Sequence, residues 1–267
     1  MAIKGTLSPR RLGRGVVLIA LALIGLLLYL KSDRRALAGR TYEVVVTGPP
    51  SKSPMPLVFV FHGRNGTSTE IRYRTGIAEA AEARGERALF VFPQAREYPG
   101  YHAVGWQTAC DGPDMRFIDA VVHALSAEYP IDHTRIFASG FSWGGEMAIA
   151  FGCCRHEQVR AIAPMSGGVW DSVGEACRTH APAFRITIGL DDAIELPSIV
   201  QHLTDEFRSL HRCSKQSHVT DPHCNAYEGC DAPVIQCLYP GLAHQVPSEA
   251  GPEIWQFFRS FPGRTGS

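Results

Sequence analysis

The feature that most constrains this chain is a G-x-S-x-G pattern, Gly140-Phe141-Ser142-Trp143-Gly144. The residues before it, 135–139, form a short run rich in strand formers, and the residues after it are small or helix-favouring. A strand, a tight turn and a helix in this order predict a nucleophile elbow, which exposes a serine hydroxyl at the tip of a strained connection. We expect the glycines to be required because a Cβ would collide with neighbouring backbone and because glycine tolerates positive φ. The pattern makes Ser142 a candidate nucleophile.

The rest of the chain alternates between short apolar runs and segments with helical spacing. Continuous apolar runs such as residues 56–61 and 88–93 are typical of strands that are buried on both faces. Further strands are predicted at residues 41–46, 160–164, 183–189 and 233–241. Helices are predicted from Ser68 toward Ala83, after Ser142, and around residues 117–125, 200–210 and 254–258. This alternation predicts an α/β fold with a mostly parallel central sheet and helices on both faces.

Length and charge limit the classes of function. A chain of 267 residues can bury one substantial core. Its 26 Lys and Arg residues balance its 26 Asp and Glu residues, and no basic run is long enough to indicate a nucleic-acid partner. We expect no nucleic-acid partner, and no feature of the sequence implies a protein partner.

The N-terminus has the layout of an export signal. Lys4, Arg10, Arg11 and Arg14 precede an uncharged apolar run at residues 16–30. This run is short for a full membrane span, which needs about 20 residues, but long for the core of a signal peptide. Residues 36–38 (ALA) have the form of a cleavage site. We therefore expect residues 1–39 to be a signal peptide or an uncleaved membrane anchor, and residues 40–267 to form the folded domain outside the cytosol.

The eight cysteines take their meaning from that compartment. In an exported chain an even number of cysteines predicts disulfides in the loops, although the sequence does not give their pairing. The alternative is a metal site in the tail of the chain. Its candidate ligands are His211, Cys213, His218, His223, Cys224 and Cys230. Their spacing forms no recognisable pair of C-x-x-C knuckles, which favours disulfides and no bound metal.

Ser142 needs a base to take its proton, and that base needs an orienting acid. In a fold of this kind the partners follow in the order serine, acid, histidine, each after a strand. Asp191 and Asp192 follow the predicted strand 183–189, and His244 follows the predicted strand 233–241. A Gly-x-x-Asp-x-hydrophobic pattern favours Asp192 over Asp191 as the acid. The candidate catalytic residues are therefore Ser142, Asp192 and His244.

Acyl transfer also requires N–H donors that point at the oxyanion. The backbone N–H of Trp143, directly after the nucleophile, is the first candidate, and that of Arg64, in the loop after the strand 56–61, is the second. We expect His62 to pack or hydrogen-bond within this loop, at the edge of the substrate site, without transferring a proton. Trp106 is a further candidate to line the substrate site. This chemistry requires no metal or organic cofactor.

With these residues assembled, the chain resembles the exported feruloyl esterases and polyhydroxybutyrate depolymerase-like esterases of the α/β-hydrolase superfamily. The resemblance rests on stretches that span nearly the whole folded region, including residues 59–63 (FVFHG), 129–145, 161–168, 224–230 and 241–247. It implies the α/β-hydrolase fold, with Ser142 as nucleophile, His244 as base and Asp192 as acid. It also implies extracellular hydrolysis of plant-wall or polyester-like esters.

The chain departs from the family pattern at two places. The loop after His62-Gly63 reads Arg-Asn-Gly where relatives often have Cys-Gly-Gly, and the strand before the acid ends in Ile188-Gly189 where His-Gly is usual. An arginine in that loop either narrows the cleft or contacts a carboxylate. Two other functions stay open: an acyltransferase that uses the same three residues, and a non-catalytic wall-binding module.

Overall fold

The computed structural model describes residues 32–98, 100, 102–169, 177–178 and 180–263. One compact unit runs from Arg34 to Ser267 and contains the fold described below. The predicted export segment lies almost entirely outside the described residues, so its role stays a prediction. Among the residues that are described, no helix has both the length and the apolar character needed to cross a membrane.

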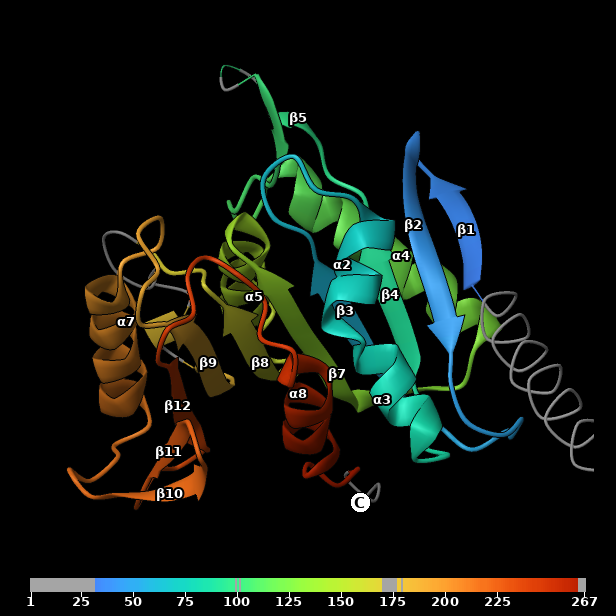
Figure 1. The fold of residues 1–267 in the computed structure, drawn as a ribbon. Coiled ribbons are helices and arrows are strands. Elements are labelled where there is room, and N and C mark those ends of the chain that lie inside the picture. Colours follow the sequence, from blue (N-terminus) through green and yellow to red (C-terminus); the bar gives the residue numbers. More distant parts are fainter. Residues whose placement is uncertain (1–31, 99, 101, 170–176, 179, 264–267) are drawn as a thin grey trace, which may run out of the picture. The chain divides into compact units, whose positions relative to one another are not determined.

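A ten-stranded sheet forms the centre of the molecule, in the order β1-β2-β4-β3-β7-β8-β9-β12-β11-β10 (Figure 1). Its central strands, from β4 to β12, are parallel to their neighbours, and the outer strands are antiparallel. The strands are β1 (Ser32–Leu37), β2 (Arg40–Val46), β3 (Met55–Phe61), β4 (Leu89–Pro93), β7 (Ile131–Phe141), β8 (Val159–Met165), β9 (Ala183–Gly189), β10 (Ser217–Asp221), β11 (Cys224–Tyr227) and β12 (Val234–Tyr239). The predicted, mostly parallel sheet is confirmed.

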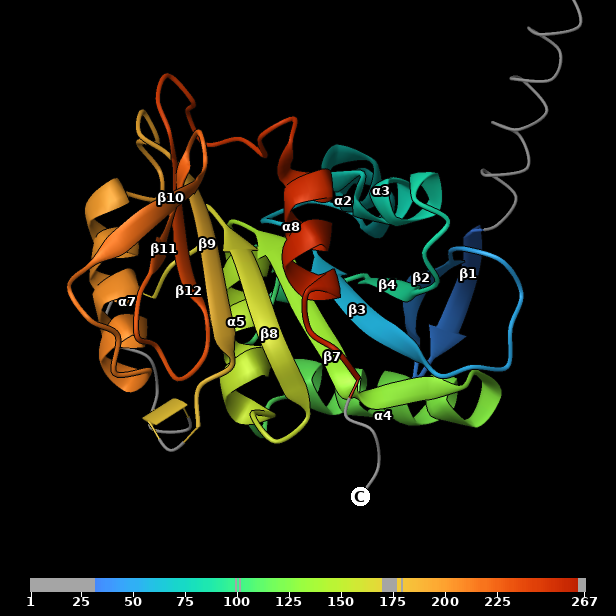
Figure 2. The same cartoon turned by 90° about the horizontal axis from the view of Figure 1, so that it is seen from below.

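Helices cover both faces of the sheet, as Figure 2 shows. The helices are α2 (Ser68–Thr75), α3 (Ile77–Ala83), α4 (Pro113–Glu128), α5 (Trp143–Cys154), α7 (Pro197–Leu210) and α8 (Ala250–Arg259). Strand β3 is buried throughout and contributes residues to the hydrophobic cores on both faces of the sheet. Leu57, Phe59 and Phe61 belong to the hydrophobic core that includes residues of α4, α5 and α7, whereas Val58 and Val60 belong to the core that includes residues of α2, α3 and α8. This alternation explains the continuous apolar run, because each face of the strand meets a helix layer.

Two predicted segments differ in detail from the structure. The helix expected from Ser68 toward Ala83 is two helices, because Gly76 adopts a left-handed conformation (φ 59°) between α2 and α3. The N-cap of α2 is Thr67, whose side chain accepts a hydrogen bond from the N–H of Glu70. The cysteine-rich segment expected as a loop contains β10 and β11, which extend the sheet as an antiparallel hairpin.

The sheet also begins earlier than residue 40. Strand β1 precedes the expected start of the domain and joins β2 through a two-residue turn at Ala38 and Gly39. Arg35 in β1 donates to the Glu128 carboxylate at 2.5 and 2.9 Å and to the Tyr129 hydroxyl at 2.8 Å. Residues 34–39 are therefore part of the folded unit, which a boundary at residue 40 leaves out.

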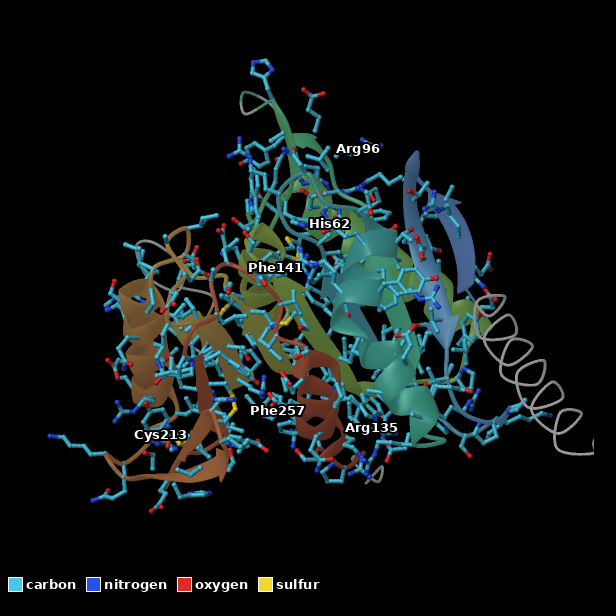
Figure 3. The ribbon with its side chains drawn as sticks, in the orientation of Figure 1. His62, Arg96, Arg135, Phe141, Cys213 and Phe257 are labelled. Carbon is cyan, nitrogen blue, oxygen red and sulfur yellow. A yellow bond between two sulfur atoms is a disulfide. The ribbon has the colours of Figure 1, made fainter. Side chains whose placement is uncertain are left out.

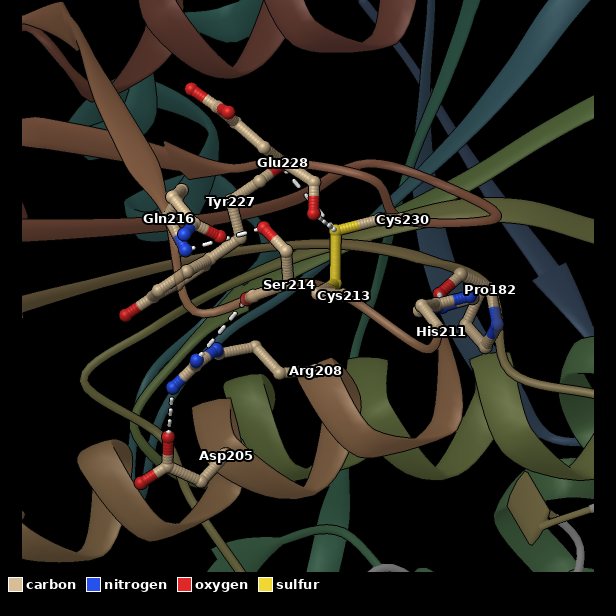
Figure 4. The surroundings of a disulfide bond; sticks show 10 residues. All are labelled: Pro182, Asp205, Arg208, His211, Cys213, Ser214, Gln216, Tyr227, Glu228 and Cys230. Carbon is tan, nitrogen blue, oxygen red and sulfur yellow. Dashed lines mark hydrogen bonds and ion pairs between the residues drawn. A yellow bond between two sulfur atoms is a disulfide. The ribbon is translucent and has the colours of Figure 1, made fainter.

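All eight cysteines form disulfides, as predicted. The pairs are Cys110–Cys154, Cys153–Cys177, Cys213–Cys230 and Cys224–Cys237. The adjacent pair at the end of α5 ties this helix to two separate loops. Cys213–Cys230 closes the segment that carries β10 and β11, beside Arg208, which donates to Asp205 at 2.6 Å and to the Ser214 carbonyl (Figure 4). These bonds remove the alternative of a metal site, because its three cysteine ligands are oxidised.

The loop after β4 is not entirely irregular. Its strands β5 (Arg96–Tyr98) and β6 (Ala103–Gly105) pair with each other as a small antiparallel sheet. The Gly105 end of this hairpin lies against the Trp143 ring, since a Cβ on Gly105 would stand 2.4 Å from that ring. The hairpin therefore borders the start of α5.

Candidate active site

Ser142 sits between β7 and α5 with a strained backbone, φ 55° and ψ −127°. Its N–H donates to the Met165 carbonyl at the end of β8, which anchors the turn to the sheet. The glycines of the motif are required for close approach. A Cβ on Gly140 would lie 2.2 Å from the Gly144 carbonyl oxygen, and a Cβ on Gly144 would lie 2.2 Å from the Phe61 carbonyl oxygen.

The structure corrects one reason given for these glycines. Neither Gly140 nor Gly144 has a positive φ; within the motif that conformation belongs to Ser142 itself. A non-glycine residue with positive φ stores strain and persists only where its surroundings hold it. Here β7 and β8 on one side and α5 on the other hold Ser142, which presents its side chain at the carboxyl end of the sheet.

Asp192 and His244 meet through a paired hydrogen bond. The His244 Nδ1 lies 2.8 Å from Asp192 Oδ2 and 3.1 Å from Oδ1, and the Asp192 side chain is fully buried. Since an ionised carboxylate only accepts, Nδ1 carries the hydrogen and Nε2 keeps its lone pair. The Phe141 ring packs against the imidazole at 4.7 Å. The histidine is thus held in one orientation by a carboxylate and an aromatic ring.

The loops that carry the two residues are joined by backbone bonds. The N–H of Leu190 donates to the Tyr239 carbonyl, and the N–H of Asp191 donates to the Leu242 carbonyl. Asp191 is exposed, whereas Asp192 turns inward and its Oδ1 accepts the N–H groups of Ile194 and Glu195 at 3.0 and 2.9 Å. Asp192 is therefore the carboxylate that bonds to His244.

A tight turn at residues 63–66 faces Ser142 from the end of β3. The Gly66 N–H donates to the Gly63 carbonyl, and Asn65 exchanges two bonds with Val104 in β6, both 2.9 Å long. A Cβ on Gly63 would lie 3.2 Å from the Ser142 Cβ, so the turn lies directly against the serine. Among the described residues, the N–H of Arg64 has no hydrogen-bond acceptor. We refer to these residues as the 63–66 turn.

His62 and Trp106 support the 63–66 turn through hydrogen bonds to its backbone and to the residue before it. His62 Nε2 accepts the Ala95 N–H at 3.0 Å, so Nδ1 carries the hydrogen and donates it to the Gly63 carbonyl at 2.8 Å. Burial lowers the pKa of His62 and favours this neutral form. Trp106 Nε1 donates to the His62 carbonyl. These contacts agree with the expectation that His62 forms hydrogen bonds within its own loop.

Trp106 differs from its expected position. It is 1% exposed and packs edge-on against Phe61, with ring centroids 5.2 Å apart. A side chain covered to this extent has no surface left for a substrate. The sequence signal, an aromatic residue in a polar loop, does not separate a residue that lines a cleft from one that supports it.

A cavity of about 300 Å³ opens between these loops. Ser142, His244 and the 63–66 turn line it together with α2, and Figure 3 shows His62 and Phe141 at this end of the sheet. Its lining residues are His62, Gly63, Arg64, Gly66, Glu70, Ile71, Arg74, Phe141, Ser142, Ile194 and His244. The structure therefore brings the expected serine, histidine and Arg64 to one cavity.

Two acidic residues near the site had no signal in the sequence. Glu195 is 5% exposed, and its Oε1 has no hydrogen-bond partner within the described part of the chain. Burial, followed by the charge of Asp192, raises the pKa of Glu195 to about 7. Burial, followed by the charge of Glu195, raises the pKa of Glu146 in α5 to about 8. Glu146 lies in the helix after Ser142 and Glu195 in the loop of Asp192, and their charges interact unfavourably. Within the described residues neither forms an ion pair.

This fold and site define a class of protein. No model of a known protein family matches the sequence. The structure resembles an acetyl xylan esterase from Aspergillus awamori with a TM-score of 0.69 and 15% identity, over 85% of this chain and 98% of that one. It also resembles a ferulic acid esterase with a TM-score of 0.61 and 16% identity, over 86% and 98% of the two chains. The chain has the α/β-hydrolase fold.

Sequence relatives make the class more specific. The chain is 29% identical over 238 residues to feruloyl esterase C from Emericella nidulans, covering 82% of this chain and 84% of that protein. It is 27% identical over 224 residues to a probable feruloyl esterase C from Aspergillus flavus, covering 78% and 79%. The protein is a homologue of the feruloyl esterases with the fold of α/β-hydrolases, and the comparisons identify it as a carboxylic ester hydrolase.

Proposed function

We propose that the protein is an exported serine esterase that acts through Ser142, His244 and Asp192. The observation that carries the proposal is that His244, which is bonded to the buried Asp192, lines the same cavity as Ser142. The pair leaves the Nε2 lone pair of His244 available as a base, which is the property that an activated serine requires.

The reaction proceeds in two halves. His244 takes the proton of Ser142 while the serine oxygen attacks the ester carbonyl, and the backbone N–H groups of Trp143 and Arg64 hold the resulting oxyanion. His244 then protonates the departing alcohol, which leaves an acyl group on Ser142. A water molecule, deprotonated by His244, attacks the acyl-enzyme and releases the acid. Asp192 stabilises the imidazolium in both halves.

Substitution of the serine tests this assignment. Ser142→Ala is expected to abolish hydrolysis of 4-nitrophenyl acetate and labelling by a fluorophosphonate probe, without a change in the circular-dichroism spectrum. Ser126→Ala is the matched control, because the Ser126 hydroxyl bonds only to the Val122 carbonyl in α4 among the described residues. Hydrolysis by the Ser142 variant at the wild-type rate would exclude Ser142 as the nucleophile.

For the substrate we propose feruloyl or acetyl esters of plant-wall polysaccharide, or a polyhydroxyalkanoate-like polyester. The relatives named as feruloyl esterases and the structural neighbour named as an acetyl xylan esterase support the first two. A panel of methyl ferulate, acetylated xylan, hydroxybutyrate oligomers and simple acetate esters ranks these classes. Product analysis with an added alcohol separates hydrolysis from acyl transfer.

We further propose that the protein is exported, which the four disulfides support because they need an oxidising compartment. Since β1 belongs to the sheet, cleavage after residue 38 would remove a strand whose Arg35 is bonded to Glu128. We therefore place any cleavage before residue 32. N-terminal sequencing of the exported protein tests this, and a mature chain that starts at Gly39 would contradict it.

A further inference from the structure

Arg64 occupies a rigid position beside the proposed nucleophile. It is the second residue of the 63–66 turn, whose backbone is closed by the bond from Gly66 to Gly63 and tied to β6 by Asn65. His62 holds the preceding residue through its Nδ1–H. These bonds determine where the exposed Arg64 side chain begins, at the edge of the cavity that this residue lines.

The charge of Arg64 is not matched by the protein. The other arginine of the cavity wall, Arg74, is paired with Glu70 at 3.1 Å and lies over the Phe141 ring at 4.8 Å. Arg64, in contrast, forms no ion pair with any residue that the structure describes. Asp192, a buried acid of the site, is not part of the cavity lining and is already bonded to His244 and to two N–H groups. The charges of Glu70 and Arg74 cancel, so the Arg64 guanidinium has no matching acid among the residues that line the cavity.

We propose that Arg64 binds a carboxylate on the substrate, so that the preferred ester carries a negative charge close to the bond that is cleaved. This proposal rests on the proposed function, because it takes Ser142 as the centre of the reaction. The guanidinium suits a carboxylate because its planar N–H groups can bond both oxygens at once. The positive charge also raises the local concentration of an anionic substrate and is screened by salt.

Pairs of esters that differ only in charge test the proposal. Methyl hydrogen adipate and its neutral amide, methyl adipamate, place the charge on the acyl part. 4-Acetoxybenzoate and 4-acetoxybenzamide place it on the alcohol part. The quantity measured is the charge preference, which is kcat/KM of the anionic ester divided by kcat/KM of its neutral partner. We expect the wild-type protein at low salt to prefer the anionic member of at least one pair.

Three variants assign that preference to Arg64. Arg64→Gln is expected to lower the charge preference by about three- to tenfold, the range for one partly exposed ion pair with arginine geometry. Arg64→Lys keeps the positive charge but loses the planar group that can bond both carboxylate oxygens, so it should retain part of the charge preference. Arg212→Gln is the control, since Arg212 is a highly exposed arginine that pairs with Asp231 outside the cavity. It should leave the preference unchanged.

Each outcome decides the question. A wild-type protein without charge preference in either pair, or an Arg64→Gln variant with an unchanged preference, overturns the proposal. If Arg64→Gln does not fold, the salt dependence of the wild-type charge preference tests the proposal instead. Raising salt from about 0.01 M to about 1 M shortens the Debye length from about 30 Å to about 3 Å, and a preference that stays constant would overturn it. Full activity of Ser142→Ala would reject the proposed function, whereas an inactive Ser142→Ala with no charge preference in the wild type rejects only the role of Arg64.

Discussion

Two loops face Ser142 from opposite sides, and they are built in different ways. The 63–66 turn is held by neutral groups: a neutral His62, the Trp106 indole and the amides of Asn65 and Val104. The acid loop, residues 190–195, is held by carboxylates. Asp192 accepts two N–H groups of its own loop, and Glu195 is buried beside it. One loop is therefore fixed by hydrogen bonds between neutral groups, whereas the other contains two buried carboxyl groups, of which Glu195 has a raised pKa.

The difference suggests a division of tasks. A donor for an oxyanion needs a constant position, which the 63–66 turn provides because none of its supporting bonds requires an ionised side chain. The acid loop must instead stabilise a positive charge that forms on His244 during each reaction, which requires a buried negative charge at Asp192. A second acid at Glu195 would oppose that ionisation unless it stayed protonated, and its raised pKa keeps it protonated in acidic solution.

The largest effect should follow from removing the charge of the acid loop. Asp192→Asn keeps the shape of the side chain but loses the carboxylate that holds the Nδ1–H of His244. We expect kcat to fall by about 10³- to 10⁴-fold. Asp191→Asn is the matched control, because Asp191 is exposed and does not contact His244. Steady-state kinetics with 4-nitrophenyl acetate measure both, and equal losses in the two variants would contradict the choice of Asp192.

The support of the 63–66 turn should be the next most sensitive element. His62→Ala removes the acceptor of the Ala95 N–H and the donor to the Gly63 carbonyl, and it leaves a void beside Trp106. We expect the free energy of unfolding to fall by about 2–4 kcal/mol, together with a lower kcat. Urea unfolding measures the first quantity. A variant with wild-type stability and kcat would show that His62 does not hold the turn.

Glu195 makes the acid loop sensitive to pH. Its pKa is about 7 in the folded protein, above its ordinary value of 4.5, so folding favours the protonated form. The folded protein binds more protons than the unfolded chain between these pH values, and stability falls as the pH rises through them. Glu195→Gln removes the ionisation. We expect the variant to gain about 1–3 kcal/mol relative to wild type at pH 8 compared with pH 4.

Urea unfolding at both pH values tests the prediction for Glu195. Glu157→Gln, at an exposed position, is the control and should show no such change. A stability difference between Glu195→Gln and wild type that is the same at pH 8 and pH 4 would show that Glu195 does not titrate in this range.

The smallest effect concerns one hydrogen bond of the 63–66 turn. Asn65→Gly allows the positive φ of 56° but removes the acceptor of the Val104 N–H. We expect a loss of about 0.5–1.5 kcal/mol in the free energy of unfolding. Asn65→Asp keeps an acceptor and should lose less. If the glycine variant were the more stable of the two, this bond would not hold the turn to β6.

Much of this arrangement follows from local patterns. Buried strands such as β3 and β9 are visible as apolar runs, and their alternation with helices predicts the parallel sheet. The positions of Asp192 and His244 after strands β9 and β12 predict that they reach the same edge, since parallel strands end on one side. Other features had no local signal. Strand β1 is rich in charged residues, so its sequence resembles the end of the export segment, and Trp106 resembles a surface aromatic until its neighbours are known.

By itself, the sequence determined the elements, the edge at which the candidate residues gather, and the fact that the cysteines are oxidised. Side-chain periodicity and glycine-bounded turns are local properties, so they can be recognised without the fold. Only the tertiary structure decided which cysteines pair, that the strained φ belongs to Ser142, and that Glu195 lies near both Asp192 and Glu146. Each of these depends on residues far apart in the chain. Their burial and mutual charge exist only after the sheet has brought them together.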